Sequence, residues 1–348
     1  MRVGMIPENP LEWFLSKVNA IPFPVADAFV GMLQARAVIA GTRLGVFAAL
    51  ASGPASVTEL ARRLSCKESG LLSLLEALVS CGYLVGKQGK YVVSRRARKW
   101  IMPDDPQSVN CFIESTDDYW TMMGRLEEVI RTGNSLDLHD QLQDEKEWRR
   151  YLYGLHDLSK MAAKEMILRC PLARSSKCLL DIGGGHGGYA AAYCRRYPHL
   201  RAVIFDLPQA IAIGREIIPK YYEDVSARIT FREGDVTKGS FGSGYDAILL
   251  LNIIHHFNPD QIQQVLKNII ESLNPGGRLL ILDQIRQASR TASYLGSLAQ
   301  LLFLVMTRGK SYSIEEVTGW IQMGGFSNVR VKNLIVGPGA SVLSAVKK

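Results

Sequence analysis

The glycine-rich stretch Leu179–Gly188 (LLDIGGGHGG) carries the clearest potential for chemistry in this 348-residue sequence. An apolar run typical of a strand leads into the glycines, and a helical segment, Tyr189–Tyr197, follows them. Glycines permit positive φ, and they let backbone N–H groups at a helix N-terminus approach a bound ligand closely. The stretch therefore predicts a ligand-binding turn between a strand and a helix.

The spacing of the glycines alone leaves two classes of cofactor open. Gly183, Gly185 and Gly188 satisfy the G-x-G-x-x-G pattern of nicotinamide dinucleotide sites. Asp181, two residues before the first of them, argues against a dinucleotide, because a carboxylate there would face a pyrophosphate unfavourably. An acid at this place suits a cofactor that lacks phosphates and has a cationic amino-acid end, such as S-adenosylmethionine (SAM).

Two further acids follow apolar runs. Asp206 ends VIFD, where an acid can accept hydrogen bonds from both ribose hydroxyls, and Asp235 with Val236 would lie near the adenine. Acids at three successive strand ends favour SAM over the alternative that each is a helix cap or turn residue, because ligands bind at this edge of parallel sheets. The predicted SAM contacts, with S-adenosylhomocysteine as product, are Asp181, Gly183, Gly185, Asp206, Leu207, Asp235, Val236 and Asn252.

The elements that would position these residues change in kind along the chain. From Cys178 on, short apolar runs alternate with helical segments, which predicts an α/β domain with a parallel, Rossmann-like sheet over residues 171–348. Residues 1–100 predict a mainly helical domain with one hairpin. Residues 101–170 predict a helical connector between these two parts.

The N-terminal part has the order of a winged helix. Val25–Leu50 has apolar residues at helical spacing. The capping box Ser56–Glu59 predicts a helix over Val57–Leu64, and Lys67–Ser80 predicts a second helix. Two short runs around a glycine turn between residues 82 and 93 then predict a β-hairpin.

Composition excludes several classes of protein. With 47% hydrophobic, 21% charged and 8% aromatic residues, the chain is not disordered or collagen-like. No apolar run approaches about 18 residues, and the N-terminus does not resemble a secretory signal, so we expect no membrane span and a cytoplasmic protein. Six scattered cysteines predict neither a disulfide framework nor a metal site. A net charge of +8 permits anionic partners without requiring them.

Several motifs together resemble the SAM-dependent O-methyltransferases with an N-terminal winged-helix dimerisation domain. This family includes plant caffeic-acid-type and hydroxyindole O-methyltransferases and many bacterial natural-product enzymes. The resemblance covers about residues 25–345 and rests on DIGGGHG (181–187), FDLP (205–208), EGD (233–235), IIHHF (253–257), LNPGGRLLILD (273–283) and GGFSNV (324–329). It implies a homodimer whose winged helix contacts the partner subunit instead of DNA. It also implies a small-molecule acceptor bound between the helical connector 101–170, which contributes to the acceptor pocket, and the SAM sheet.

The resemblance also implies the catalytic residues. His255 aligns with the family's histidine base, which removes a hydroxyl proton as the oxygen attacks the SAM methyl. Asp283 matches the first acid that orients this base, which is usually Glu, and His256 lies where many relatives have Asp. Ser311 falls where the family has a second acid. This departure leaves open C- or N-methylation, or an acceptor that is already ionised.

A mostly apolar, planar acceptor is predicted from side chains on the helices that would face the cleft. Core packing is the alternative for any one of them, and Tyr151 and Ser159 give a weaker signal of the same kind. The predicted acceptor-binding residues are Tyr119, Trp120, Met123, Leu155, His256, Phe257, Phe303 and Met306.

Two functions other than methyl transfer compete with this interpretation. A winged-helix DNA-binding regulator would explain the basic run Arg95–Lys99 and a pI near 9.1. The second helix, Lys67–Ser80, has one Lys and no Arg, however, and its leucines suit burial, so we expect no nucleic-acid partner. A protein that binds SAM without transferring methyl is the other alternative, because of Ser311.

Overall fold

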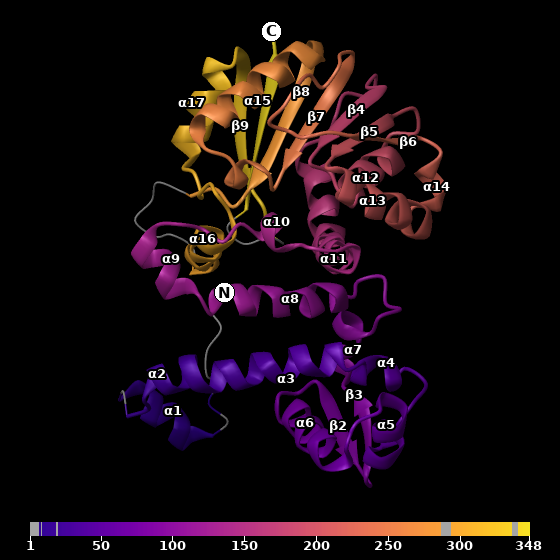
Figure 1. Cartoon of the computed structure of the whole chain (residues 1–348), viewed down its shortest axis with the longest axis vertical. Coiled ribbons are helices and arrows are strands. Elements are labelled where there is room, and N and C mark those ends of the chain that lie inside the picture. The colour runs from indigo at the N-terminus through magenta and orange to yellow at the C-terminus, as the bar shows by residue number, and fades with distance from the viewer. Residues whose placement is uncertain (1–6, 8, 19, 287–293, 336–339) are drawn as a thin grey trace. The chain divides into compact units, whose positions relative to one another are not determined.

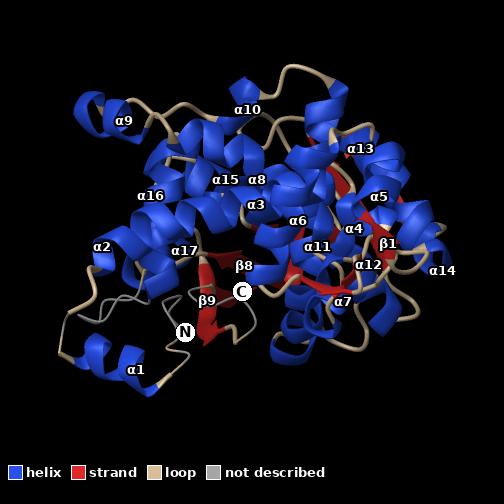
Figure 2. Cartoon of the chain, turned by 90° about the horizontal axis from the view of Figure 1, so that it is seen from below, coloured by secondary structure: helices blue, strands red, loops and turns tan. Residues whose placement is uncertain are grey.

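The computed structural model describes residues 7, 9–18, 20–286, 294–335 and 340–348 (Figure 1). Contacts within the chain group it into two units, Met1–Asp117 and Asp118–Lys348, and each unit is described on its own. The helices and strands are distinguished by colour in Figure 2.

The N-terminal unit is mainly helical, as predicted. Ser56 Oγ accepts a hydrogen bond from the Glu59 N–H at 3.2 Å, and the Glu59 carboxylate accepts one from the Ser56 N–H at 2.7 Å. This reciprocal cap starts a helix at the predicted residue. The elements are α1 (Pro10–Lys17), α2 (Phe23–Val25), the π-helical turn η1 (Ala26–Val30), α3 (Gly31–Arg43), α4 (Val46–Ala49), β1 (Ala55–Ser56), α5 (Val57–Leu64), α6 (Glu68–Ser80), β2 (Leu84–Lys87), β3 (Lys90–Val93) and α7 (Arg95–Ile101). The strands form an antiparallel sheet in the order β1-β3-β2.

Two glycines have different roles in the segment Val25–Leu50, for which the sequence predicts helical structure. Gly41 lies within α3, where a Cβ would come within 2.9 Å of the Leu78 side chain on α6, so glycine permits the close approach of these helices. Gly45 has φ +77°, a left-handed conformation that breaks the helix between α3 and α4. Only Gly45 therefore interrupts the helix, whereas Gly41 serves the packing of α3 on α6.

Many apolar side chains of the first helices are exposed in the single chain. The continuous helix Phe23–Arg43 is long and apolar enough to cross a membrane, a feature that the sequence analysis did not expect. Helices that pack against protein meet the same criterion. Arg36, in the middle of this helix, forms an ion pair with Asp117 at 2.5 Å. The exposed apolar residues include Leu11, Trp13, Phe14, Phe23, Val25, Phe29, Val30, Met32, Leu33 and Leu44.

The C-terminal unit contains a seven-stranded sheet in the order β6-β5-β4-β7-β8-β10-β9. Strands β4 to β8 pair in parallel, and β10 pairs antiparallel with β8 and β9, which confirms the α/β prediction. The strands are β4 (Cys178–Ile182), β5 (Arg201–Asp206), β6 (Ile229–Glu233), β7 (Tyr245–Leu251), β8 (Leu273–Asp283), β9 (Phe326–Asn333) and β10 (Ser341–Lys347). The helices are α8 (Asn110–Met123, which crosses the unit boundary), α9 (Leu126–Thr132), α10 (Leu138–Gln141), α11 (Glu145–Arg169), α12 (Gly188–Arg196), α13 (Pro208–Tyr221), α14 (Glu223–Ser226), the 3₁₀ turn η2 (Ile254–His256), α15 (Pro259–Ser272), α16 (Tyr294–Met306) and α17 (Ile314–Met323).

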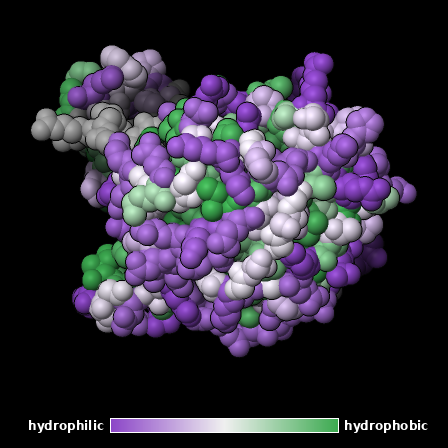
Figure 3. Space-filling model, turned by 90° about the horizontal axis from the view of Figure 1, so that it is seen from above, coloured by the Kyte–Doolittle hydropathy of each residue, from purple (hydrophilic) through white to green (hydrophobic). Residues whose placement is uncertain are grey.

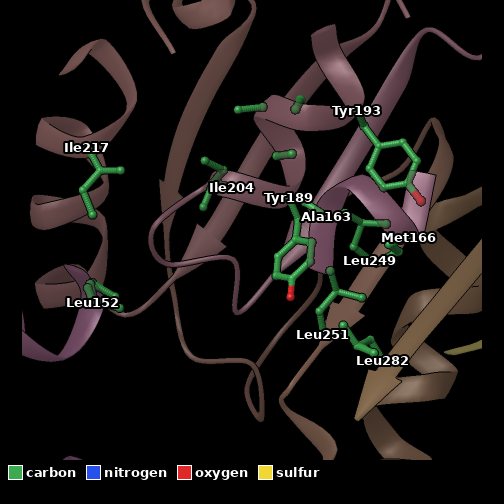
Figure 4. Packing of buried hydrophobic residues seen from close by; sticks show 14 of the residues in the cluster. Leu152, Ala163, Met166, Tyr189, Tyr193, Ile204, Ile217, Leu249, Leu251 and Leu282 are labelled. Carbon is green, nitrogen blue, oxygen red and sulfur yellow. The ribbon is translucent and has the colours of Figure 1, made fainter. Parts of the chain in front are cut away.

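Alternate residues of each central strand enter two separate hydrophobic cores. In β7, Leu249 packs in a core with α11, α12 and α13, whereas Ile248 and Leu250 pack with α15 and α17 on the other face. Figure 4 shows part of the first core, in which Tyr189 of α12 lies near Leu251. The face of the molecule drawn in Figure 3 is mostly hydrophilic, with small apolar patches. Burial on both faces explains why these strands are continuous apolar runs.

Candidate functional site

The glycine turn after β4 is shaped by close packing. Gly183 and Gly187 have φ of +66° and +69°, and α12 begins directly afterwards at Gly188. A Cβ on Gly183 would collide with the side chain of Ile253, and one on Gly187 would collide with Ile204 and Ile218. Glycine is therefore required both for the backbone conformation and for the space. The turn joins β4 directly to the start of α12.

Asp206, at the end of β5, is joined directly to this turn. One carboxylate oxygen accepts a hydrogen bond from the Gly185 N–H at 2.8 Å, and the other accepts one from the Leu207 N–H at 2.7 Å. Burial raises the pKa of Asp206 to about 6, although these two hydrogen bonds oppose the increase. The structure thus brings Gly185, Asp206 and Leu207 together.

Asp181 is a buried acid with an unsatisfied oxygen. The side chain is 1% exposed, and Oδ2 has no hydrogen-bond partner among the described residues. Burial, with the nearby Asp206, raises the pKa of Asp181 to about 7. A Cβ on Gly184 would lie 2.6 Å from the Asp181 Cγ, so the carboxyl group packs against the backbone of the turn. Two buried acids beside a glycine turn fit a ligand with a cationic end and hydroxyl groups.

The remaining predicted cofactor residues lie at the next strand ends. Asp235 Oδ1 accepts hydrogen bonds from the N–H and hydroxyl of Thr237 at 2.8 and 2.7 Å, so part of this carboxylate holds its own loop. Val236 is buried beside the sheet. Asn252 follows β7 with φ +54°, a left-handed conformation that asparagine tolerates, and its side chain hydrogen-bonds Tyr189.

His255 and Asp283, which the resemblance implies as base and orienting acid, lie in direct contact. His255 lies in η2 after β7, and Asp283 ends the neighbouring strand β8. The His255 Nδ1 lies 2.8 and 2.9 Å from the two carboxylate oxygens, and the His255 backbone N–H also points to Asp283 at 3.3 Å. Because both side chains are buried, this pairing fixes Nδ1 as the protonated nitrogen and leaves Nε2 as an acceptor.

Aromatic rings enclose the imidazole of His255. Phe303 stacks on it with ring centroids 4.1 Å apart and planes 4° apart, and His256 lies at 4.3 Å with a tilt of 39°. His139, which the sequence analysis did not select, stacks on His256 at 4.9 Å. It lies on the short helix α10, within a stretch that the sequence shows only as polar, so composition gave no signal for it.

Ser311 is buried near the backbone of this pair. Its Oγ has no hydrogen-bond partner within the described part of the chain. Gly309, two residues earlier, packs so closely on the carbonyls of His255 and Phe257 that a Cβ would collide with them. Tyr312 OH donates to the Phe257 carbonyl at 2.5 Å. The loop where the family has its second acid therefore contacts the histidine segment through backbone and hydroxyl groups.

The other predicted acceptor residues occupy several environments. Met306 is buried in the core shared with α11 to α13, and Tyr119, Met123 and Leu155 are partly buried against it. Trp120 is 38% exposed, and Phe257 packs against the opposite core. Tyr151 lies edge-on to His139 at 5.9 Å. Among the predicted acceptor residues that the structure describes, His256 and Phe303 contact the ring of His255 through their own rings.

Two further buried histidines support the glycine turn. His186 Nδ1 accepts a hydrogen bond from the Gly188 N–H at 3.0 Å, and burial lowers its pKa to about 4. His156 on α11 pairs with Tyr222 OH at 3.0 Å, and burial lowers its pKa to about 2. Both imidazoles are therefore neutral at neutral pH. Within the described residues, no group of three or more His, Cys, Asp or Glu is placed to hold a metal ion.

Comparisons with known proteins agree with this geometry. Residues 131–327 match the O-methyltransferase domain, and residues 27–102 match the O-methyltransferase dimerisation domain. The chain belongs to the O-methyltransferase family. This methyltransferase uses SAM as its cofactor, and the turn with its two buried acids fits that ligand.

The relatives of the methyltransferase span nearly all of it. It is 27% identical over 334 residues to the 3-hydroxy-5-methyl-1-naphthoate 3-O-methyltransferase of Streptomyces sahachiroi, covering 94% of this chain and 95% of that protein. It is similar to the solved structure of PigF with SAH, with 26% identity, a TM-score of 0.82, and coverage of 94% and 100%. Human N-acetylserotonin methyltransferase in complex with SAM shares the fold, with 21% identity, a TM-score of 0.83, and coverage of 99% of both chains.

Proposed function

We propose that the methyltransferase transfers the methyl group of SAM to a hydroxyl of a small, planar and mostly apolar aromatic or polycyclic acceptor, with His255 as general base. The observation that carries this proposal is the buried His255–Asp283 pair, which lies at the same edge of the sheet as the cofactor acids. The relative from Streptomyces sahachiroi, named as a hydroxynaphthoate O-methyltransferase, supports an aromatic substrate.

The residues proposed to hold the cofactor lie at or near the ends of the parallel strands. In this proposal Asp206 accepts hydrogen bonds from the ribose hydroxyls. The unsatisfied oxygen of Asp181 accepts one from the cationic amino-acid end. Asp235 and Val236 are proposed to contact the adenine, and Asn252 to border the site. SAM, when bound, supplies a methyl group on a positively charged sulfur.

His255 and Asp283 perform the proton chemistry in this proposal. Nε2 of His255 accepts the hydroxyl proton as the acceptor oxygen forms its bond to the methyl carbon and the carbon–sulfur bond breaks. Asp283 keeps Nδ1 protonated, orients the ring, and stabilises the imidazolium that results. The proton then passes from Nε2 to solvent when the products leave. S-adenosylhomocysteine and the methylated acceptor are released.

The proposal extends to the assembly and the cell compartment. A homodimer is supported by the match of residues 27–102 to the dimerisation domain and by the exposed apolar side chains of α1 to α3. The order of α5, α6 and the β2–β3 hairpin supports a winged-helix classification. The leucines Leu71, Leu75 and Leu78 of α6 are buried, so this helix is not proposed to bind nucleic acid. We propose a cytoplasmic enzyme.

Incubation with labelled SAM and a panel of phenols, quinones and tetrapyrroles identifies the acceptor. On that acceptor, His255→Ala is expected to lower turnover about 10²–10⁴-fold with nearly unchanged SAM affinity. Asp283→Asn is expected to lower it less, since this residue orients the base without taking the proton. If His255→Ala retains more than about a third of wild-type turnover, catalysis rests on proximity to an acceptor that ionises readily or attacks through carbon or nitrogen. Binding of SAM without any labelled product would favour a protein that does not transfer methyl.

A further inference from the structure

Five aromatic rings from separate parts of the C-terminal unit form one stacked column. In order they are Phe303 of α16, His255 and His256 of η2, His139 of α10 and Trp148 of α11. The successive ring centroids are 4.1, 4.3, 4.9 and 5.5 Å apart. The two outer contacts are parallel within 4° and 1°, and the inner two are tilted by 39° and 29°. The proposed base is therefore the second ring of a continuous stack.

This column restrains a motion that the pairing with Asp283 does not. Hydrogen bonds from Nδ1 to the carboxylate hold one edge of the His255 ring and fix its tautomer. They leave the ring able to tilt about that edge, and Ser311, with its unpartnered Oγ, offers no described polar contact to prevent it. Phe303 stacks parallel on the ring, and His256 contacts it at a tilt of 39°, so these two rings restrict the tilt.

We propose that His256, supported by His139 and Trp148, acts with Phe303 as a clamp that sets the tilt of the His255 ring, in place of the second acid of the family. This inference rests on the proposed role of His255 as the base. His256 is then a positioning residue that acts through His255, and its predicted contact with the acceptor is not its main contribution.

The two supporting imidazoles act as neutral rings. Burial, together with neighbouring His255 and His139, lowers the pKa of His256 well below its usual range. Burial also lowers the pKa of His139, although Asp137 and Asp140 favour its charged form. A single positive charge on His255 during catalysis is therefore not opposed by a second cation in the stack, and the face of Phe303 stabilises that charge.

The ends of the column are tied to each other. The Leu136 N–H donates to the Val305 carbonyl at 2.8 Å, which joins the segment before His139 to the end of α16. Arg308 forms ion pairs with Asp137 at 2.7 Å and with Asp140 at 2.5 Å, on both sides of His139. These links join the segment that carries His139 to the end of the helix that carries Phe303.

The test is a set of substitutions in the full-length enzyme, with SAM and the identified acceptor. His256→Ala is expected to lower kcat about 10- to 100-fold with SAM affinity within about twofold, the range for a reacting group displaced by up to about 1 Å. His256→Phe keeps a ring and is expected to restore kcat to within about threefold of wild type. His139→Ala is expected to show a smaller loss. His199→Ala, on an exposed histidine, is the matched control and is expected to change neither constant.

A double-mutant cycle separates positioning from acceptor binding. If His256 acts through His255, then His256→Ala has no further effect on kcat or acceptor KM in the His255→Ala background. An equal loss in both backgrounds, or a Phe variant as slow as the Ala variant, would overturn the clamp. Failure of the proposed function is a different result, namely full activity of His255→Ala itself. Circular dichroism and SAM affinity of each variant show whether a loss reflects misfolding. If His256→Ala fails either measurement, His139→Ala takes its place in the same cycle.

Discussion

Asp181→Asn tests the electrostatic state of the cofactor site through the stability of the protein without ligand. The side chain of Asp181 is buried, and burial together with Asp206 raises its pKa from 3.8 to about 7. In the unfolded chain the carboxyl group ionises near 3.8, so between these two values the folded protein binds the extra proton. Stability contributed by this group is therefore present at low pH and is lost as the pH rises toward 7.

The magnitude follows from the same values. The interval between 3.8 and about 7 corresponds to about 4 kcal/mol at high pH, at about 1.36 kcal/mol for each pH unit. Between about pH 5.5 and 8.5 the wild type should lose about 2 kcal/mol of this through Asp181, because ionisation in the folded state is complete only above 7. Asparagine has the same shape and does not titrate. The stability of Asp181→Asn minus that of the wild type should therefore increase by about 2 kcal/mol over this range.

Urea denaturation followed by circular dichroism, at about pH 5.5, 7 and 8.5, measures this difference. The buried histidines His156 and His186 titrate in both proteins, so their contribution cancels in the difference between the two stabilities. A constant difference in hydrogen bonding between Asp and Asn at position 181 does not change with pH. With saturating SAM, the wild type should regain stability mainly at the higher pH, since a cationic ligand favours the carboxylate. A difference that is flat or decreases with pH would show that Asp181 is stably paired in the free protein, and the argument for a cationic ligand there would fail.

Two further predictions concern the cofactor and the assembly. Asp206→Ala should weaken SAM binding by about 1–3 kcal/mol, because a buried hydrogen-bond partner is lost. The wild type should bind NAD weakly or not at all, and calorimetry that shows NAD preferred over SAM would contradict the assignment. Light scattering should give the mass of a homodimer, whose interface we expect to exceed about 2,000 Å². Leu33→Glu, on the exposed face of α3, should weaken the dimer and lower activity. A stable, active wild-type monomer at micromolar concentration would refute the dimer.

Local patterns predicted much of the fold because they have local physical causes. The capping box at Ser56 starts α5 at the expected residue, and apolar runs buried on both faces became parallel strands. The membrane criterion met by Phe23–Arg43 shows the limit of this approach. The expectation that no membrane span is present rests on the absence of an uninterrupted apolar run. The mean hydropathy of a helix can be high although the helix contains a few polar residues such as Arg36.

Within the site, residues that follow strands were predictable because topology brings strand ends together. Asp181, Asp206 and Asp283 each lie at the end of a parallel strand, and pairing of β4, β5, β7 and β8 places them along one edge. Asp235 was expected at this edge as well, but its hydrogen bonds to Thr237 depend on a loop conformation that spacing does not reveal.

His139 could not be predicted from its position in the sequence. It is 116 positions before His255 in the chain, and it reaches the column only because the ion pairs of Arg308 and the Leu136–Val305 hydrogen bond draw α10 to the end of α16. In sequence, Ser311 in place of an acid leaves open C- or N-methylation, or an acceptor that is already ionised. In the structure, the same change coincides with a histidine whose ring contacts both Phe303 and His256. Orientation of a catalytic imidazole is a geometric requirement that stacked rings can meet as well as a carboxylate can. The loss of an acid therefore predicts loss of activity only where no ring packs against the imidazole in its place.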